Sequence, residues 1–535
     1  MSLPVAPDRP AATGRPARLA LFLALVAILL WPVAWNGGDP LGFPDTSGYY
    51  EQGGQVIERL LSAATPGAAD AGSGAGSGEG SGASTGAPAG AGAEGAAAGE
   101  GRAEEPRVYT IRSVPFSVMV NLPMRLLGEM GFVLAQAAVT AWLILLAVRD
   151  LPRWRAAGAA LATAGATTLP FYTAQVMADA MAGWLILAVA LLALRRWGRW
   201  TAGALLLVAF LSVAAHYSHV PLGLALIPAL GLVLALQRRW GLAVATQAPL
   251  VLALAVNVAV GLAAGSGASI APSRIPIMLA RTLTDGPGRL YLEEACPEAG
   301  WALCEVYAEG DFPGSIREAL WGPDSMLVRA TPAQRLAIME EEIPLVLAVL
   351  REHPVEQSRA LLANSARQLA LIGMDDVRRT EMAILSPLDI EIDFDRLERD
   401  APVRALEAVQ WAAVAAGLAG LALALARGGP GVRPAAGLLV LGLVVNAAVC
   451  GGLSAPADRY QGRVIWTLVL LGLALALRPR PAPEREGWVP DRRGRLVRPG
   501  ARGGFARPAA GQRSLPGGGR ATGRNAQGRR GAGAR

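Results

Sequence analysis

Long apolar runs recur along most of this chain, and they constrain its fold more than any other feature. A bilayer-spanning helix needs roughly 20 predominantly apolar residues. The chain has 535 residues, is 53% hydrophobic and has a mean hydropathy of +0.36, which is typical of a polytopic membrane protein. We therefore predict an all-α polytopic membrane fold with about ten transmembrane helices. The ten predicted spans are 19–35, 132–148, 156–169, 171–194, 201–215, 220–236, 242–264, 405–426, 435–453 and 464–477.

Arginine placement predicts the orientation of these spans. The first run lacks a small-residue cleavage site, so we interpret it as a retained helix and not as a cleaved signal peptide. Arg9, Arg15 and Arg18 precede it. If that end is cytoplasmic, the later cytoplasmic loops are RDLPRWR, RRWGRW, QRRW and RGGPGVR, and all are Arg-rich, as the positive-inside rule requires. We predict that both termini are cytoplasmic.

Composition divides the rest of the chain. Residues 1–18 form a cytoplasmic N-terminus, 19–264 a first membrane module, 265–404 an external domain and 405–477 a final group of membrane helices. Within the first module, 63–101 is almost wholly Gly, Ala, Ser and Glu, which predicts a disordered external insertion. The tail 478–535 carries 15 Arg against three acidic residues, and we predict that it is disordered. Nucleic acid could bind such a tail, but we favour a solvated segment beside anionic membrane lipids, with no nucleic-acid partner.

The predicted external domain is acidic and helical. Residues 265–404 hold 23 acidic and 14 basic residues, and PAQRLAIMEEEIPLVLAVLREH has helical periodicity. Cys296 and Cys304 lie within this domain. A disulfide bond between them is favoured over a metal site, because no histidine lies nearby and the compartment is extracytoplasmic.

Polar residues gather at the predicted external ends of the helices. Each one alone could be an interfacial anchor, since Tyr and Arg favour lipid headgroups. Charged groups that converge at membrane depth instead indicate a functional site. The residues in question are Asp45, Tyr49, Tyr50, Tyr109, Arg112, Asp179, His216, His219, Arg459, Tyr460 and Arg463.

Several of these segments carry a family resemblance. FPDTSGYYEQGGQVIERL and YTIRSVPFSVMVNLPMRLLG are similar to the start of GT-C-type integral membrane glycosyltransferases, which use polyprenyl-phosphate sugars. VMADAMAGWLILAVALL resembles the second acidic position of these enzymes, and SHVPLGLALI and DRYQGRVIWTLVLL resemble later segments of uncharacterised bacterial members. The likeness covers roughly residues 15–240 and 455–478. Phe116-Ser117 departs from the usual Tyr-Pro element, and the insertion separates two segments that normally lie closer.

The resemblance implies roles for the polar residues. Asp45 would be the general base that deprotonates an acceptor hydroxyl. Arg112, Arg459 and Arg463 would hold the leaving phosphate by charge-assisted hydrogen bonds. Asp179 would orient the acceptor, or hold a divalent ion with Asp45, and no cofactor is otherwise expected.

Tyrosine and histidine residues have further expected roles. Tyr49, Tyr50 and Tyr109 offer aromatic faces for a sugar or a headgroup. His216 and His219 are three residues apart and could bind one metal on a helix, but a hydrogen-bonding role is favoured because no third ligand is adjacent.

Alternatives to these roles stay open at this point. Asp45 could be a turn acid, and Asp179 an acid at a helix N-terminus favoured by the helix dipole. The chain contains no Walker A motif, Gly-x-Ser-x-Gly elbow or Rossmann fingerprint, which agrees with a lipid-linked donor.

The expected function is therefore a bacterial inner-membrane glycosyltransferase. Its partners would be a lipid-linked sugar donor, membrane lipids and an external envelope glycan, lipid or protein acceptor. The alternatives are a non-catalytic transporter or flippase, or a polysaccharide polymerase, for lipid-linked envelope glycans.

Overall fold

The computed structural model describes most of the chain and shows a helical protein. The described residues are 15–43, 45–64, 112–263, 268–270, 275–374, 379–382, 390–393, 401–429, 431–479, 489–490 and 496–497. The chain divides into two units, Met1–Arg478 and Pro479–Arg535.

All helices of the described residues belong to the first unit. The helices of its membrane-type part come before residue 264 and after residue 400. The N-terminal helices are α1 Arg15–Leu29, α2 Trp31–Trp35, α3 Thr46–Ala64, α4 Val114–Leu127, α5 Met130–Ala147, α6 Arg153–Gly165, α7 Leu169–Ala174, α8 Asp179–Leu194, α9 Arg199–Ala215, α10 His219–Leu236, α11 Trp240–Ala245 and α12 Ala248–Ala263. The C-terminal ones are α21 Ala401–Arg427, α22 Val432–Ala447, the π-helical turn η2 Ala448–Gly452, and α23 Asp458–Ala476.

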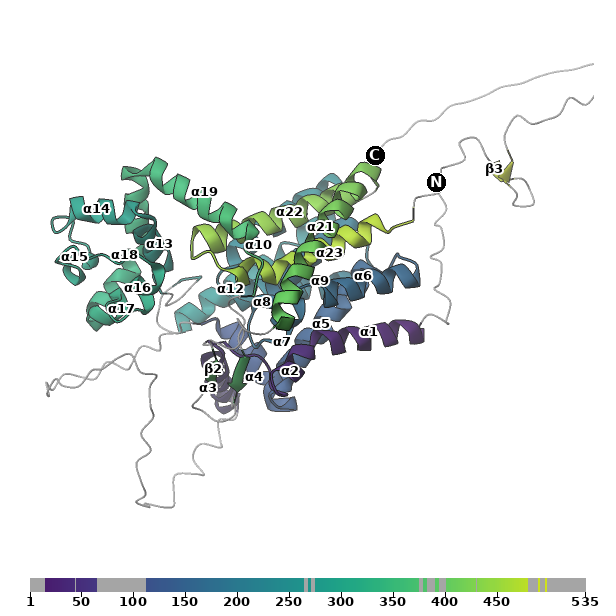
Figure 1. Ribbon diagram of the computed structural model, residues 1–535, viewed down its shortest axis with the longest axis horizontal. Helices are drawn as coiled ribbons and strands as arrows, with labels where there is room; N and C mark the ends of the chain where they lie inside the picture. The colour runs from purple at the N-terminus through teal and green to yellow at the C-terminus, as the bar shows by residue number, and fades with distance from the viewer. Residues whose placement is uncertain are drawn as a thin grey trace, which may run out of the picture. The chain divides into compact units, whose positions relative to one another are not determined.

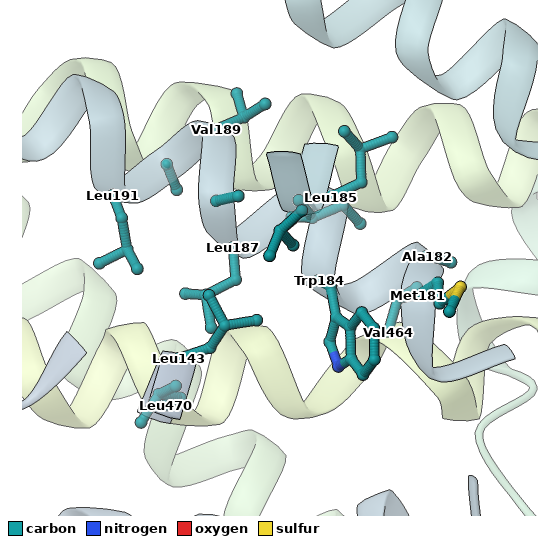
Figure 2. Packing of buried hydrophobic residues seen from close by; sticks show 14 of the residues in the cluster. Leu143, Met181, Ala182, Trp184, Leu185, Leu187, Val189, Leu191, Val464 and Leu470 are labelled. Atoms are coloured by element: carbon teal, nitrogen blue, oxygen red, sulfur yellow. The ribbon is translucent and has the colours of Figure 1, made fainter. Parts of the chain in front are cut away.

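Helix α8 is the centre of the bundle. All of its 16 residues are buried, and after Asp179 its sequence is apolar all round, as a helix enclosed on every side requires. Figure 2 shows side chains of α8, with Leu143 of α5 and Leu470 of α23 below them and Val464 of α23 beside Trp184. Gly183 lets the Trp466 ring of α23 approach α8 closely, because a Cβ there would lie 2.6 Å from the indole Nε1.

Helices α21 and α23 also cross in close contact. A Cβ at Gly472 would lie 2.0 Å from the carbonyl oxygen of Gly417, and a Cβ at Gly420 would lie 2.6 Å from that of Gly472. Small residues at helix crossings let backbones approach closely and gain van der Waals contact, which drives helix association in membranes. These glycines therefore hold α23, which carries two of the predicted site arginines, at a defined position in the bundle.

Each of the ten predicted spans falls on a helical segment, but only part of the ten-span prediction is supported. Six segments in the described part of the chain are long and apolar enough to cross a membrane: Pro16–Trp35, Met130–Ala147, His219–Leu236, Trp240–Ala263, Arg404–Arg427 and Val432–Gly452. The protein is therefore a helical, membrane-type protein. The predicted continuous run 171–194 is wrong, because it is broken between α7 and α8.

The segments on either side of the low-complexity insertion form helices that lay outside the predicted spans. Helix α3 packs along α4, with Gly53 against the Ser117 carbonyl oxygen, which a Cβ would approach to 2.1 Å. Asn121 Nδ2 donates to the Tyr50 carbonyl oxygen at 2.9 Å and strengthens the pairing. The predicted disordered insertion 63–101 begins within α3, at residues 63–64, and is otherwise outside the described residues.

Residues 275–374 form a second helical group with its own core, drawn in teal and green in Figure 1. Cys296 and Cys304 are joined by a disulfide bond, as the sequence predicts. The helices are α13 Ile277–Asp285, α14 Pro287–Ala295, α15 Ala302–Val306, α16 Ile316–Trp321, α17 Met326–Arg329, α18 Pro332–Glu352 and α19 Pro354–Ala370.

Helix α19 connects this group to the bundle through paired hydrogen bonds. Gln368 Nε2 donates to the Ala457 carbonyl oxygen at 2.7 Å, and Gln368 Oε1 accepts from the Ala457 amide at 2.9 Å. Asp458 Oδ1 accepts from the Gly373 amide at 2.9 Å. These bonds fix the start of α23 against the end of α19.

Two short strand pairs accompany the helices of this largely helical chain. Strand β1, Arg379–Met382, pairs antiparallel with β2, Ile390–Asp393. In the second unit, β3 Val489–Pro490 pairs antiparallel with β4 Leu496–Val497. Apart from those four residues and Pro479, the predicted disordered tail beyond Arg478 lies outside the described residues, as do residues 1–14.

Candidate functional site

The site begins at the break between α7 and α8. The chain after α2 runs along this break as an isolated parallel bridge between Leu41 and Gln175. The Leu41 amide donates to the Ala174 carbonyl oxygen at 2.9 Å, and the Val176 amide donates to the Leu41 carbonyl oxygen at 2.8 Å. Thr46 Oγ1 donates to the Val176 carbonyl oxygen at 3.1 Å. The loop that carries Asp45 is therefore fastened to the segment that leads into Asp179.

Asp179 is the first residue of α8 and forms ion pairs with two guanidinium groups. Arg463 Nη1 donates to Asp179 Oδ1 at 3.1 Å, and Arg459 Nε lies 3.3 Å from the same oxygen. The side chains of Asp179, Arg459 and Arg463 are 1%, 10% and 2% exposed. Arg459 and Arg463 are four residues apart on α23, so both lie on one helix face. The helix dipole at the start of α8 adds to the stabilisation of the carboxylate.

Arg463 has further partners beyond Asp179, and one carboxylate oxygen of Asp179 has no hydrogen bond among the described residues. Arg463 Nη2 donates to Asn446 Oδ1 at 3.2 Å and contacts Cys450 Sγ at 3.2 Å. Asn446 Nδ2 in turn donates to the Tyr460 carbonyl oxygen at 2.7 Å. Asp179 Oδ2 is buried and has no hydrogen-bond partner within the described residues. A buried, unsatisfied carboxylate oxygen is costly, so this atom is available to a water molecule or a ligand hydroxyl.

Asp45 is more accessible than Asp179 and pairs with a different arginine. Arg112 Nη2 donates to Asp45 Oδ1 at 2.9 Å, and the two side chains are 26% and 42% exposed, respectively. Gly48 leaves room for this contact, since a Cβ there would lie 2.1 Å from Arg112 Nη1. The guanidinium also lies over the Tyr49 ring, 5.6 Å from its centroid.

His216 and His219 lie close together, with ring centroids 5.5 Å apart. The Ser218 amide donates to His216 Nδ1 at 3.1 Å, so a neutral His216 carries its proton on Nε2. Burial, and then the positive charge of Arg463, lowers the pKa of His216 to about 4, while Asp179 and Asp45 oppose this shift. The carboxylates and arginines of the site are thus near enough to act on this imidazole, which is neutral at pH 7.

His219 has the opposite tautomer. Its Nδ1 lies 2.8 Å from the Ser212 carbonyl oxygen, which can only accept a hydrogen bond, so Nδ1 carries the proton. Its Nε2 is buried and has no hydrogen-bond partner within the described residues. The pair therefore presents one N–H donor, His216 Nε2, and one unprotonated acceptor nitrogen, His219 Nε2.

The predicted tyrosines differ in their placement. Tyr49 is 2% exposed and packs edge-to-face on Phe116, with centroids 4.7 Å apart, so the predicted stacking of a sugar on its face is wrong. Tyr50 is partly buried against the main core. The Tyr460 ring lies beside both Arg459 and Arg463, 5.4 and 5.2 Å from their guanidinium carbons. Tyr109 lies outside the described residues.

The site as a whole favours an anion. Three guanidinium groups face two carboxylates and two neutral imidazoles, which leaves one net positive charge. Burial is the main cause that raises the pKa of the Tyr49 hydroxyl, and the charges of four site residues also shift it: Asp45, Arg112, Arg459 and Asp179. Both ion pairs therefore lie near this one hydroxyl. Among the described residues, no group of three or more His, Cys, Asp or Glu could hold a metal ion.

Three buried polar residues contribute to the site without having been predicted. Thr46 fixes the Asp45 loop, Gln136 Nε2 donates to the Gln175 carbonyl oxygen at 2.7 Å, and Asn446 holds Arg463. Gln136 and Asn446 are isolated polar residues inside predicted spans. Such residues usually hydrogen-bond across helices, so this signal could have identified them.

The fold and the site together define a helical membrane-type protein with a charged, partly buried polar cluster, formed by Asp45, Arg112, Asp179, His216, His219, Arg459 and Arg463, at one end of its bundle. Comparison with known proteins finds no matching family, no similar curated protein and no similar solved structure.

Proposed function

We propose that the protein is a GT-C-type glycosyltransferase of a bacterial inner membrane, with both termini in the cytoplasm. It transfers a sugar from a polyprenyl-phosphate donor to an external envelope glycan, lipid or protein. One observation carries this proposal: Asp45, Asp179 and three arginines come from four separate segments of the chain and meet in one cluster with a net positive charge. Such a transfer requires a general base close to groups that bind an anion.

The two carboxylates are in different environments, and this difference assigns their roles. Asp45 is 42% exposed and can reach an acceptor that arrives from outside. As the acceptor oxygen attacks C1 of the sugar, its proton passes to Asp45 and the bond from C1 to the phosphate oxygen breaks. Polyprenyl phosphate leaves, and the configuration at C1 is inverted. Arg112 orients the Asp45 carboxylate toward the acceptor through a charge-assisted hydrogen bond.

Asp179 acts as a positioning residue in this proposal, because its side chain is almost fully buried between two arginines. It holds the guanidinium groups of Arg459 and Arg463 in place, so that their positive charge stabilises the leaving phosphate. Pre-positioned donors of this kind stabilise charge as it develops and need no reorganisation during the reaction. The unpartnered Oδ2 can accept a hydrogen bond from an acceptor hydroxyl.

The same buried charges favour a second candidate, a non-catalytic transporter or flippase for lipid-linked glycans. Ionisable groups buried among membrane helices are typical of substrate pathways. Asp179 and Arg463 are 1% and 2% exposed in the helical bundle. A transporter would use this ion pair to open and close a path and would need no base at Asp45. A polysaccharide polymerase is the remaining alternative, in which Asp45 would be needed for joining repeat units.

An Asp45→Asn variant separates these functions. It should be expressed from its own locus in the source strain, beside the wild type, a deletion and a Glu58→Gln control. Glu58 on α3 pairs with Arg125 on α4 at 2.9 Å, and Asp45 and Arg112 lie just before these two helices, so the control removes a comparable ion pair away from the site.

Lipid-linked glycans and surface polysaccharide should then be compared by mass spectrometry. The proposed transfer predicts that the deletion and Asp45→Asn lack one sugar, whereas Glu58→Gln retains it. Accumulated complete repeat units in the deletion would support a polymerase or flippase. Full transfer by Asp45→Asn would refute the role of Asp45.

A further inference from the structure

The end of the bundle opposite the candidate site carries a second charged surface. Helix α8 begins at the site and ends at Leu194, and the loops around this far end contact one another. Arg195 and Arg478 both pair with Asp150, which joins the α5–α6 loop, the α8–α9 loop and the end of α23. Arg239 Nη1 donates to the Leu192 carbonyl oxygen at 3.1 Å and adds the α10–α11 loop.

Positive charge far exceeds negative charge on this surface. Asp150 is the only acidic residue that pairs with these arginines within the described chain, and two of them already share it. Arg149 has no carboxylate partner among the described residues, and its guanidinium lies 5.1 Å from the Trp197 ring centroid. The arginines of the surface are Arg149, Arg153, Arg155, Arg195, Arg196, Arg199, Arg238, Arg239 and Arg478.

The arginines also repel one another. Partial burial, followed by the charge of Arg195, lowers the pKa of Arg149. Partial burial, followed by the charge of Arg196, likewise lowers the pKa of Arg239. Asp150 opposes this effect at Arg149. Neighbouring like charges of this kind are stabilised when an external anion binds between them.

Exposed tryptophans accompany the arginines. Trp154, Trp200 and Trp240 are 71%, 79% and 66% exposed, and each lies at or beside the first residue of its helix. Each directly follows an arginine in the sequence. A tryptophan ring exposed to water gains little stabilisation, but the same ring is stabilised at the boundary between lipid tails and headgroups. Three such rings around one surface indicate a partner that is apolar on one side and anionic on the other.

We infer that this surface, formed by the arginines named above and by Trp154, Trp200 and Trp240, binds the anionic headgroups of acidic phospholipids. The phosphate groups lie between the guanidinium groups, and the indole rings lie against the first acyl carbons. This combination suits a lipid better than a soluble anion, because a soluble anion would leave the three exposed rings in water. Binding here is separate from the proposed sugar transfer, since none of these residues belongs to the candidate site.

The test uses the full-length protein in a neutral detergent. Its unfolding temperature should be measured while phosphatidylglycerol or phosphatidylcholine is titrated in, at low and high salt. The test variant is Arg149→Gln/Arg196→Gln/Arg239→Gln. The matched control, Arg351→Gln/Arg359→Gln/Arg367→Gln, removes the same charge from exposed positions at the end of α18 and on α19.

The expected result is tighter binding of phosphatidylglycerol by the wild type and by the control. Since each basic residue near an anionic membrane contributes about 1 kcal/mol, losing three should weaken this preference on the order of a hundredfold. High salt should weaken it in the wild type as well. The salt titration keeps the test decisive if the triple variant does not fold.

Four outcomes would overturn the inference. Equal stabilisation of the wild type by both lipids would remove the preference itself. An unchanged preference in the test variant, or an equal loss in the control, would place the binding elsewhere. Inorganic phosphate that stabilises the wild type as well as phosphatidylglycerol does would indicate a soluble anion.

Discussion

Replacing Asp179 with Asn tests whether the buried ion pair holds the site together. The substitution keeps the shape of the side chain but removes the one negative charge that Arg459 and Arg463 share. Removing one partner of a buried ion pair costs about 3–5 kcal/mol, because the remaining charge stays desolvated without a counter-ion. The free energy of unfolding of a typical native protein is about 5–15 kcal/mol, so this loss is large.

The measurement is reversible unfolding of the full-length protein in mixed micelles, followed by circular dichroism. Asp179→Asn and Arg463→Gln should each destabilise strongly, and the double variant should lose less than the two single losses combined. The coupling between contacting residues of one network is about 0.5–3 kcal/mol. Glu58→Gln, which breaks an ion pair of 68% and 36% exposed side chains, should cost about 0–1 kcal/mol. A loss below about 1 kcal/mol for Asp179→Asn, or strictly additive losses, would refute a shared buried ion pair.

Three further predictions follow from single contacts. Gly48→Ala places a methyl group 2.1 Å from Arg112 Nη1, so it should displace that guanidinium group. The proposed sugar transfer should then fall several-fold with little change in unfolding temperature, and unchanged transfer would contradict this. The fold lowers the pKa of His216, chiefly by burial, from 6.5 to about 4, so the unfolded chain binds more protons between those pH values. Stability should therefore fall as pH drops through this window, and His216→Gln should flatten that part of a plot of unfolding temperature against pH; an unchanged slope would exclude the effect. Removing the Cys296–Cys304 bond with serines should destabilise the α13–α18 group by about 2–3 kcal/mol, the value for a loop of this length, and reductant should then have no effect on its unfolding temperature.

Apolar periodicity was sufficient to predict the helices of the bundle but not the interruption in the middle of it. Each of the ten runs coincides with helical structure, because the hydrophobic signal is local. The sequence from Phe171 to Leu194 is mostly apolar and contains no Pro or Gly at the break. The interruption is stabilised by the chain around Leu41, more than 130 residues away, and no local pattern carries that information.

The candidate site was predictable in its members but not in its pairing. Arg459 and Arg463 are spaced to share one helix face, and this spacing is visible in the sequence. Their partner, Asp179, lies about 280 residues earlier, and only the packing of α8 on α23 brings them together. Tyr49 was misinterpreted because an aromatic residue beside a carboxylate has the same sequence pattern whether it faces a ligand or, as here, Phe116.

The break before α8 links the physics of the membrane to the position of Asp45. Backbone groups that leave a helix inside a membrane-type bundle must find partners in the protein, since lipid offers none. The carbonyl oxygens of Ala174, Gln175 and Val176 find theirs in the Leu41 amide, Gln136 and Thr46. The loop between α2 and α3 therefore stabilises the broken helix, and the same hydrogen bonds hold the loop in place. Asp45 lies next to Thr46 and is held in the same position, so the carboxylate is oriented before any substrate binds, as its proposed role of general base requires.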